Sequence, residues 1–119
     1  EANGLASLLA AAGFVPDGET NVTSVRSAML EPPAGEGWMA TGDAAISFFP
    51  LSSQGLFNAL FTGLGAAEAA DTYLRGERSS LVQYQQTIRS IFETYRTKLA
   101  AVYRTEKRWP DAPFWRRRN

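Results

Sequence analysis

Cysteine and histidine are both absent from the 119 residues of this chain. The lack of cysteine excludes disulfide bonds, a thiolate nucleophile and cysteine-ligated metals. The lack of histidine removes the commonest general base near neutral pH and the commonest metal ligand in proteins. Together these absences exclude serine–histidine hydrolases and zinc hydrolases. We therefore predict no metal site in the chain and no catalytic residue of its own.

Long hydrophobic runs are missing as well. No segment reaches the roughly 18 consecutive apolar residues of a transmembrane helix, and the apolar stretch at 5–12 lacks the basic flank of a signal peptide. We therefore expect no membrane partner and a cytoplasmic location. The hydrophobic fraction of 45% and the charged fraction of 20% are typical of a soluble globular protein of about one domain.

Charge of one sign is scarce in each half of the chain, although the net charge is zero. Residues 1–74 carry one cation and eight acids, whereas residues 75–119 carry eleven cations and four acids. Such asymmetry occurs in tails that bind nucleic acid or membranes, but the arginines at 116–118 are fewer than the about 4–8 cations of lipid-binding clusters. We favour electrostatic pairing between the halves, or with an absent part of the protein, and expect no nucleic-acid partner.

Two long helices are the clearest elements that the sequence predicts. The first spans residues 55–74, and its many glycines and alanines imply another element packed very close to it. Its predicted inner stripe consists of Leu56, Leu60, Leu64, Ala67, Ala70 and Asp71. The second spans residues 79–104, with Ser79 or Ser80 as its cap. Its apolar stripe recurs at steps of three and four residues: Leu81, Tyr84, Ile88, Ile91, Tyr95, Leu99 and Val102.

Shorter elements flank these helices. Apolar residues at helical spacing predict a helix over 5–12 that stops at Gly13. Residues 22–30 predict a strand with imperfect alternation, and 31–35 (EPPAG) break regular structure. Residues 38–41 (WMAT) predict a buried strand that ends at Gly42. Beyond Pro110 the second long helix cannot continue, and we expect three aromatic side chains of the tail to fold back onto a surface: Trp109, Phe114 and Trp115.

The segment between the predicted buried strand and the first long helix has the features of a ligand site. Asp43 follows a strand end, where a carboxylate accepts hydrogen bonds from ribose-like hydroxyl groups. Ala44 and Ala45 leave room for a ligand to lie against the backbone. The run 50–55 (PLSSQG) then enters a helix, whose first amides are unpaired and favour negative charge. An isolated Gly-Asp turn would mean little, but the whole arrangement is much more specific.

The run GWMATGDAAISFFPLSSQGLFNAL at 37–60 resembles the second flavin-binding motif of FAD-dependent aromatic hydroxylases and flavin-dependent halogenases, which share the para-hydroxybenzoate hydroxylase fold. The likeness covers residues 24–119. The tail, YRTEKRWPDAPFWRRR, is similar to that of halogenase-like monooxygenases, including those associated with tryptophan-derived quinone cofactors. The resemblance implies an α/β fold class, in which this chain is a fragment of an FAD-binding Rossmann-like domain dominated by two long C-terminal helices. A chain that folds alone would be mostly α.

The resemblance also implies a role for particular residues. Asp43, with Gly42 and Ala44 beside it, would bind the ribityl chain of FAD, and Pro50 would lie near the isoalloxazine ring. Backbone amides would reach the pyrimidine edge of the flavin, with Asn58 close by; these amides belong to Ser53, Gln54, Gly55 and Leu56. In halogenases the amides at the position of Gly55 also lie near a halide. The chain has Ile46 where many hydroxylases have histidine, and Phe49 where many relatives have aspartate before the proline.

A second difference from the family is an absence. The Gly-x-Gly-x-x-Gly fingerprint that holds the FAD pyrophosphate does not occur, nor do the lysine and the Trp-x-Trp-x-Ile-Pro motif of halogenases. We therefore predict the C-terminal part of a longer flavoprotein whose missing nucleotide-binding part, or a partner subunit, completes the site. By itself the chain should be inactive and bind FAD weakly or not at all. The complete enzyme would hydroxylate or halogenate an aromatic substrate, with tryptophan-type compounds among the candidates.

Three parts follow from this interpretation. Residues 1–36 are the end of a substrate or β region with a linker, 37–75 are the second flavin-binding motif, and 76–119 are the C-terminal helix with its aromatic and basic tail. The alternative is a non-catalytic helical interaction module that docks on a partner chain through the helix at 79–104 and the tail. The uneven charge and the small core available to so long a helix favour that alternative.

Overall fold

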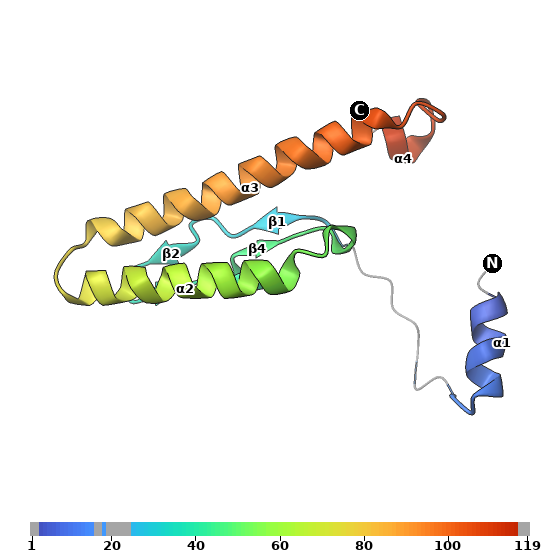
Figure 1. Ribbon diagram of the computed structural model, residues 1–119, viewed down its shortest axis with the longest axis horizontal. Helices are drawn as coiled ribbons and strands as arrows, with labels where there is room; N and C mark the ends of the chain where they lie inside the picture. Colours follow the sequence, from blue (N-terminus) through green and yellow to red (C-terminus); the bar gives the residue numbers. More distant parts are fainter. Residues whose placement is uncertain (1–2, 16–17, 19–24, 117–119) are drawn as a thin grey trace.

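Two long helices lie side by side and form most of the structure (Figure 1). The computed structural model describes residues 3–15, 18 and 25–116. Helix α2 (Gly55–Leu74) and helix α3 (Ser79–Thr105) run antiparallel and are joined by residues 75–78. Their bounds agree with the predicted 55–74 and 79–104 to within one residue. Among the described residues, none of the helices combines the length and the apolar character of a membrane span.

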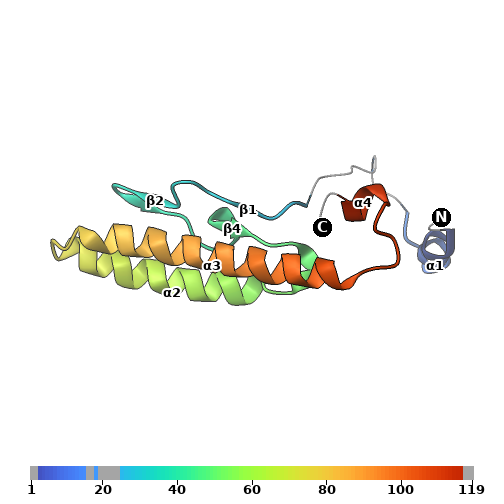
Figure 2. The same cartoon turned by 90° about the horizontal axis from the view of Figure 1, so that it is seen from above.

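Short antiparallel strands lie along one side of the helix pair (Figure 2). Strand β1 (Ala28–Met29) pairs with β4 (Ile46–Ser47), and Met29 stands opposite Ile46. Strand β2 (Ala34–Gly35) pairs with β3 (Trp38–Met39). Two 3-10 turns connect this layer to α2, and they are η1 (Gly42–Ala44) and η2 (Pro50–Ser52). The result is the helix-dominated α/β architecture that the sequence predicted.

The strands differ from the prediction in three places. The strand at 38–41 ends at Met39, and Trp38 is 47% exposed, so this strand is an outer hairpin arm and not a buried strand. Residues 34–35 form a strand inside the segment expected to be irregular. Of the strand predicted at 22–30, only Ala28–Met29 is extended and paired, and residues 22–24 lie outside the described residues.

A short helix lies near each end of the described residues. Helix α1 (Asn3–Ala11) ends just before the predicted stop at Gly13. Gly13 has φ +81°, the left-handed conformation that often follows the last turn of an α-helix and that favours glycine. The Phe14 amide then donates to the Leu9 carbonyl (2.9 Å). In the tail, helix α4 (Pro113–Arg116) places two aromatic rings edge-on against the Tyr103 ring, at centroid distances of 6.3 and 6.0 Å for Phe114 and Trp115. This confirms the expected fold-back for those two rings, whereas Trp109 is 51% exposed.

The core lies where the strands meet α2 and α3. Its buried members come from all three layers, and they are Ala34, Ala45, Ile46, Ala66, Tyr84 and Ile88. The predicted stripe of α3 is confirmed at its centre, because Tyr84, Ile88 and Tyr95 are buried. Its last member, Val102, is 63% exposed.

The predicted inner stripe of α2 is wrong. Leu56, Leu60 and Leu64 are 76%, 68% and 63% exposed. The buried face carries Asn58, Thr62 and Ala66 instead. Small and polar side chains on this face let the turn η1 and the Tyr84 ring approach the helix closely, as the glycines and alanines had suggested.

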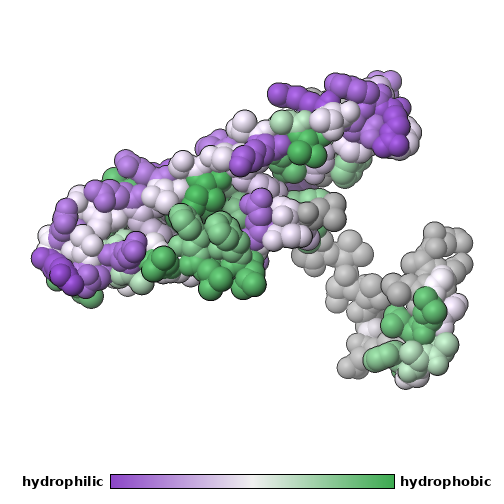
Figure 3. All heavy atoms as spheres, viewed as in Figure 1, coloured by the Kyte–Doolittle hydropathy of each residue, from purple (hydrophilic) through white to green (hydrophobic). Residues whose placement is uncertain are grey.

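The consequence is a large exposed apolar surface, which we call the outer face of α2: Leu56, Phe57, Leu60, Phe61 and Leu64. The Phe57 and Phe61 rings stack on one another with centroids 6.0 Å apart. In Figure 3 the helix shows a continuous hydrophobic patch in this region. Large exposed apolar patches usually mark surfaces that bind another protein, a membrane or a ligand.

The start of α3 also differs from the prediction. The residue at the N-cap position is Arg78, and no side chain caps the helix. The Ser80 hydroxyl is buried and donates to the Glu77 carbonyl (2.9 Å), so neither predicted serine is the cap. Serine hydroxyls often bond nearby backbone in this way, in competition with a cap.

Two ion pairs join the acidic half of the chain to the basic half, as the charge pattern predicted. Arg89 on α3 pairs with Glu31, and Arg78 pairs with Glu36 at 3.5 Å. The hydrogen bond from Arg89 lowers the pKa of Glu31 below its ordinary value. Both pairs are exposed to solvent, so they orient the strand layer on α3 more than they stabilise it.

We predict that Ile88→Ala lowers the free energy of unfolding by about 2–5 kcal/mol, because it opens a cavity at a fully buried position. Val82→Ala is the matched control on the same helix. Val82 is 52% exposed, and its truncation should change the free energy by no more than about 0.5 kcal/mol. Urea denaturation of the two variants measures the difference, and equal stabilities would contradict the core described above.

Candidate functional site

The turn η1 is anchored to the buried face of α2. The Gly42 amide donates to the Thr62 hydroxyl (2.8 Å), which in turn donates to the Asn58 carbonyl (2.7 Å). Gly42 has φ +55°, and a Cβ atom there would lie only 3.3 Å from the Ala59 Cβ. Both its conformation and the close approach therefore favour glycine. This contact sets the position of Asp43 and Ala44, the next two residues of the turn.

Asn58 ties the strand that leaves η1 to the first turn of α2. Its side chain is 3% exposed and donates from Nδ2 to the Ile46 carbonyl (3.2 Å). The backbone amide of Asn58 donates to the Gln54 backbone carbonyl (2.8 Å), in the first turn of the helix. Asn58 therefore positions β4 and the start of α2 relative to each other.

The segment that enters α2 leaves the helix N-terminus open. Ser53 is in the left-handed region (φ 52°), and its amide donates to the Pro50 carbonyl (3.2 Å). A non-glycine residue in this conformation is uncommon and often occurs at a functional turn. Gln54 occupies the N-cap position without a side-chain cap, and nothing lies within 4 Å of where a Gly55 Cβ would be. The first turn of α2 therefore begins without a side-chain cap, and a side chain at Gly55 would meet no neighbour.

Two tyrosines of α3 hydrogen-bond the backbone before η1 and before η2. The Tyr84 hydroxyl donates to the Ala40 carbonyl (2.7 Å), just before η1, and burial raises the pKa of Tyr84. The Tyr95 hydroxyl accepts from the Phe49 amide (3.0 Å), just before η2, and is also hydrogen-bonded to the Ser27 hydroxyl (2.8 Å). The packing role predicted for both tyrosines is confirmed, with these hydrogen bonds in addition.

The residues predicted to bind a cofactor divide into two groups. Gly42 and Asn58 are buried and act as anchors. The others are exposed and follow one another along η1, η2 and the start of α2: Asp43, Ala44, Pro50, Ser53, Gln54, Gly55 and Leu56. Because η1 contacts α2 at Ala59 and Thr62, the turn lies about 6–10 Å along the helix from Gly55. Ala45, expected to leave room for a ligand, is instead 1% exposed and part of the core.

This arrangement presents a carboxylate and a set of helix N-terminal amides on one exposed stretch. The carboxylate of Asp43 is an acceptor for hydroxyl groups, and the open end of α2 favours an anion or a polarised carbonyl group. The described residues contain no group of three or more Asp, Glu, His or Cys that could hold a metal ion. The carboxylate and the amides are groups that can hydrogen-bond a polar organic ligand.

The sequence interpretation missed the residues that support the site, namely Thr62 and the Ser27–Tyr95 pair. One signal was available, because Asn58, Thr62 and Ala66 recur every four residues and so share one helix face. That face carries small and polar side chains, so the leucine stripe was predicted to face the core in its place. Ser27 and Tyr95 are 68 residues apart, and no local pattern connects them.

Comparison with known proteins identified one curated relative. The chain is 35% identical over 82 residues to the "Putative FAD-dependent oxidoreductase LodB" of Marinomonas mediterranea. The match covers 69% of this chain but 21% of the relative, so the chain spans about a fifth of that protein's length. No family model matches the chain, and no solved structure matches it.

We predict that Thr62→Val destabilises the fold by about 1–3 kcal/mol, because it leaves the buried Gly42 amide without its acceptor. Thr87→Val on α3 is the matched control, since the exposed Thr87 hydroxyl only bonds the Gln83 carbonyl of its own helix. Hydrogen exchange at the Gly42 amide should accelerate in the first variant alone. Unchanged exchange there would show that Thr62 does not anchor η1.

Proposed function

We propose that this chain is the C-terminal, flavin-contacting part of an FAD-dependent oxidoreductase. The observation that carries the proposal is the exposed Asp43 carboxylate, held by the Gly42–Thr62 hydrogen bond beside the uncapped start of α2. The name of the curated relative supports both the cofactor and the class of enzyme. The resemblance of residues 37–60 to the second flavin-binding motif supports them independently of that name.

The residues present fit a flavin. The Asp43 carboxylate would accept hydrogen bonds from the ribityl hydroxyl groups, and the exposed Ala44 leaves the neighbouring surface low. The amides of Gly55 and Leu56 would face the pyrimidine edge, where the positive end of α2 favours negative charge. FAD would supply the redox chemistry, and these residues would bind it and set its orientation.

The finer proposal is a monooxygenase of the hydroxylase or halogenase-like type that acts on an aromatic substrate. Its support is the sequence resemblance, together with the surroundings of the two positions that differ from many relatives. Ile46 is fully buried in the core, so this position faces the protein interior and not a ligand. Phe49 is half-buried, and its amide is held by Tyr95. An apolar side chain at this position suits an aromatic ligand better than the aspartate of many relatives would.

The outer face of α2 supports the proposal that further polypeptide covers this chain. Five large apolar side chains, each between 49% and 76% exposed, project from one helix. Burial of apolar area at about 25 cal/mol per Å2 gives such a face a strong tendency to be covered. The occupant that we propose is the nucleotide-binding remainder of the same flavoprotein, which would also supply the pyrophosphate site.

The second candidate is a non-catalytic helical module that docks on a separate partner. The same outer face of α2 favours it, because a partner chain would bury those side chains equally well. This surface differs from the one expected from the sequence, which was the 79–104 helix and its tail. The two candidates differ in whether the protein binds flavin.

We predict that Asp43→Ala in the complete flavoprotein weakens FAD binding about tenfold or more, since hydrogen bonds to a charged group contribute about 1.5–3 kcal/mol. Asp111→Ala is the control, because Asp111 is an exposed residue that follows α3 in the sequence and is not among the residues predicted to bind FAD. Flavin absorbance per protein after gel filtration measures occupancy. Equal flavin content in the two variants would count against the role of Asp43.

We predict that Leu60→Glu has opposite consequences in two contexts. In the 119-residue chain it should leave stability nearly unchanged, because Leu60 is 68% exposed. In the complete flavoprotein it should lower the melting temperature and the flavin content, because a charge would be buried without a partner. Val82→Glu, at a 52% exposed position on α3, should be tolerated in both contexts.

Two results would decide between the candidates. If Leu60→Glu is tolerated by the complete protein as well, its remainder does not cover the outer face of α2. If the 119-residue chain forms oligomers that Leu60→Glu dissociates, and the complete protein retains no flavin, the interaction module is the correct function. Light scattering and flavin absorbance provide both readouts.

A further inference from the structure

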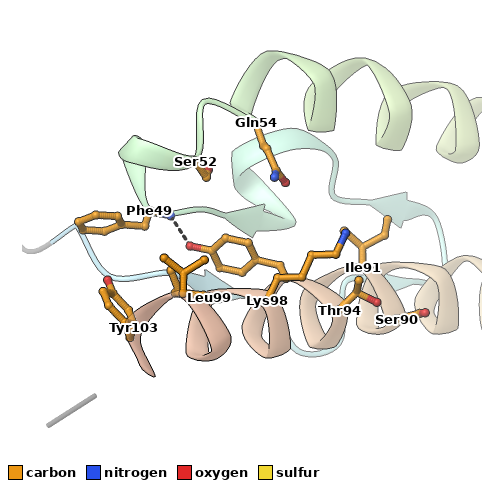
Figure 4. A pocket seen from close by; sticks show the side chains of 11 residues that line it. Phe49, Ser52, Gln54, Ser90, Ile91, Thr94, Lys98, Leu99 and Tyr103 are labelled. Atoms are coloured by element: carbon orange, nitrogen blue, oxygen red, sulfur yellow. Dashed lines mark hydrogen bonds between the residues drawn. The ribbon is translucent and has the colours of Figure 1, made fainter. Parts of the chain in front are cut away.

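A pocket between η2 and α3 shares Gln54, but no other lining residue, with the residues predicted to contact the flavin. Its volume is about 520 Å3. One side is formed by Phe49, Ser52 and Gln54 of the loop that enters α2, and the other by α3 (Figure 4). This volume lies within the range of about 300–1,000 Å3 that is usual for small-molecule sites.

Most of the wall area of the pocket is apolar, and hydroxyl groups, the Gln54 amide and the Lys98 ammonium group interrupt it. Ile91, Leu99 and Val102 of α3 provide aliphatic surface, and Phe49 lines the loop side of the pocket. Figure 4 shows Lys98 lying along α3 and Gln54 pointing from the start of α2 toward that helix. A mainly apolar cavity with a few convergent polar groups is the usual form of a ligand site.

Lys98 gives the pocket a positive charge that nothing in its lining neutralises. No carboxylate lines the pocket, and among the described residues Lys98 forms no ion pair. The preceding cation on α3 differs from Lys98 in this respect, because Arg96 pairs with Glu93 at 3.4 Å. An uncompensated ammonium group at the edge of an apolar cavity favours a ligand with an anionic group.

Hydrogen bonds and ring packing hold the loop wall of the pocket against α3. The Tyr95 hydroxyl holds the Phe49 amide at 3.0 Å and the Ser27 hydroxyl at 2.8 Å. The Tyr95 ring, which lines the pocket, packs against Phe48 with a centroid distance of 4.5 Å. These contacts fix the loop to α3, so a ligand would find the wall already in place and would not have to order it.

We propose that this pocket binds a small molecule with an apolar ring system and one anionic group. The ring would lie between Phe49 and the aliphatic wall of α3, and the anion would lie at the Lys98 ammonium group. Gln54 and Thr94 would supply hydrogen bonds. That this ligand is the substrate of the enzyme rests on the function proposed above, whereas its binding to the pocket does not.

The test compares two probes with the same ring and the same chain length, the anionic indole-3-acetate and the neutral indole-3-acetamide. Each is titrated into the 119-residue chain without flavin and followed by amide NMR shifts. The anionic probe should bind about three- to fivefold more tightly, the size of effect expected for a partly exposed ion pair. The shifts should centre on Gln54, Ser90 and Thr94, which line the pocket.

Variants assign the effect to the pocket. Lys98→Met keeps the aliphatic stem and should abolish the preference for the anionic probe. Lys107→Met is the matched control, because Lys107 does not line the pocket, and it should keep the preference. Thr94→Trp places a ring in the cavity from an exposed position and should abolish the binding of both probes.

The proposal fails if the two probes bind equally, if Lys98→Met retains the preference, or if the shifts centre on the outer face of α2. It also fails if Thr94→Trp binds the probes as the unmodified chain does. Because the titration contains no flavin, loss of the FAD role of Asp43 would leave its outcome unchanged. The reverse also holds, so the two proposals fail independently.

Discussion

The contact between η1 and the small, polar face of α2 is the constraint on which the rest of the site depends. The Gly42 amide reaches the Thr62 hydroxyl at 2.8 Å only because neither Gly42 nor Ala59 carries a larger side chain. A hydrogen bond of this kind contributes modestly when formed, but an unpaired buried amide is costly. The turn is therefore held at one place on the helix, and Asp43 is held with it.

This constraint also explains the orientation of α2. A helix that presents Asn58, Thr62 and Ala66 to its neighbours must present its leucines and phenylalanines elsewhere. Helix periodicity couples the two faces, so the close approach of η1 creates the exposed apolar surface on the opposite side. Burial of the small, polar face of α2 therefore has two results, the anchored turn and the exposed apolar surface proposed for docking.

Helix α3 supplies what the short strands cannot. Each strand pair has only two residues per strand, too few to be stable alone. The hydroxyl groups of Tyr84 and Tyr95 bond the backbone on either side of the turn–strand–turn segment. Ile88, which lies between them in the sequence, is buried in the core with Tyr84. The same helix forms the wall of the pocket that Lys98 borders. The position of the loop and the shape of the pocket therefore depend on one element.

The sequence by itself determined the spans of α2 and α3, the stop of α1 at Gly13 and the central stripe of α3, because helix spacing and turn chemistry are local. It also located residues 43–56 as the candidate site, of which several side chains are exposed. Only the tertiary structure decided which face of α2 is buried, because a stripe of leucines indicates that a face will be covered but not by what. The anchoring roles of Thr62 and Tyr95 likewise arise from contacts between distant segments, which no local pattern encodes.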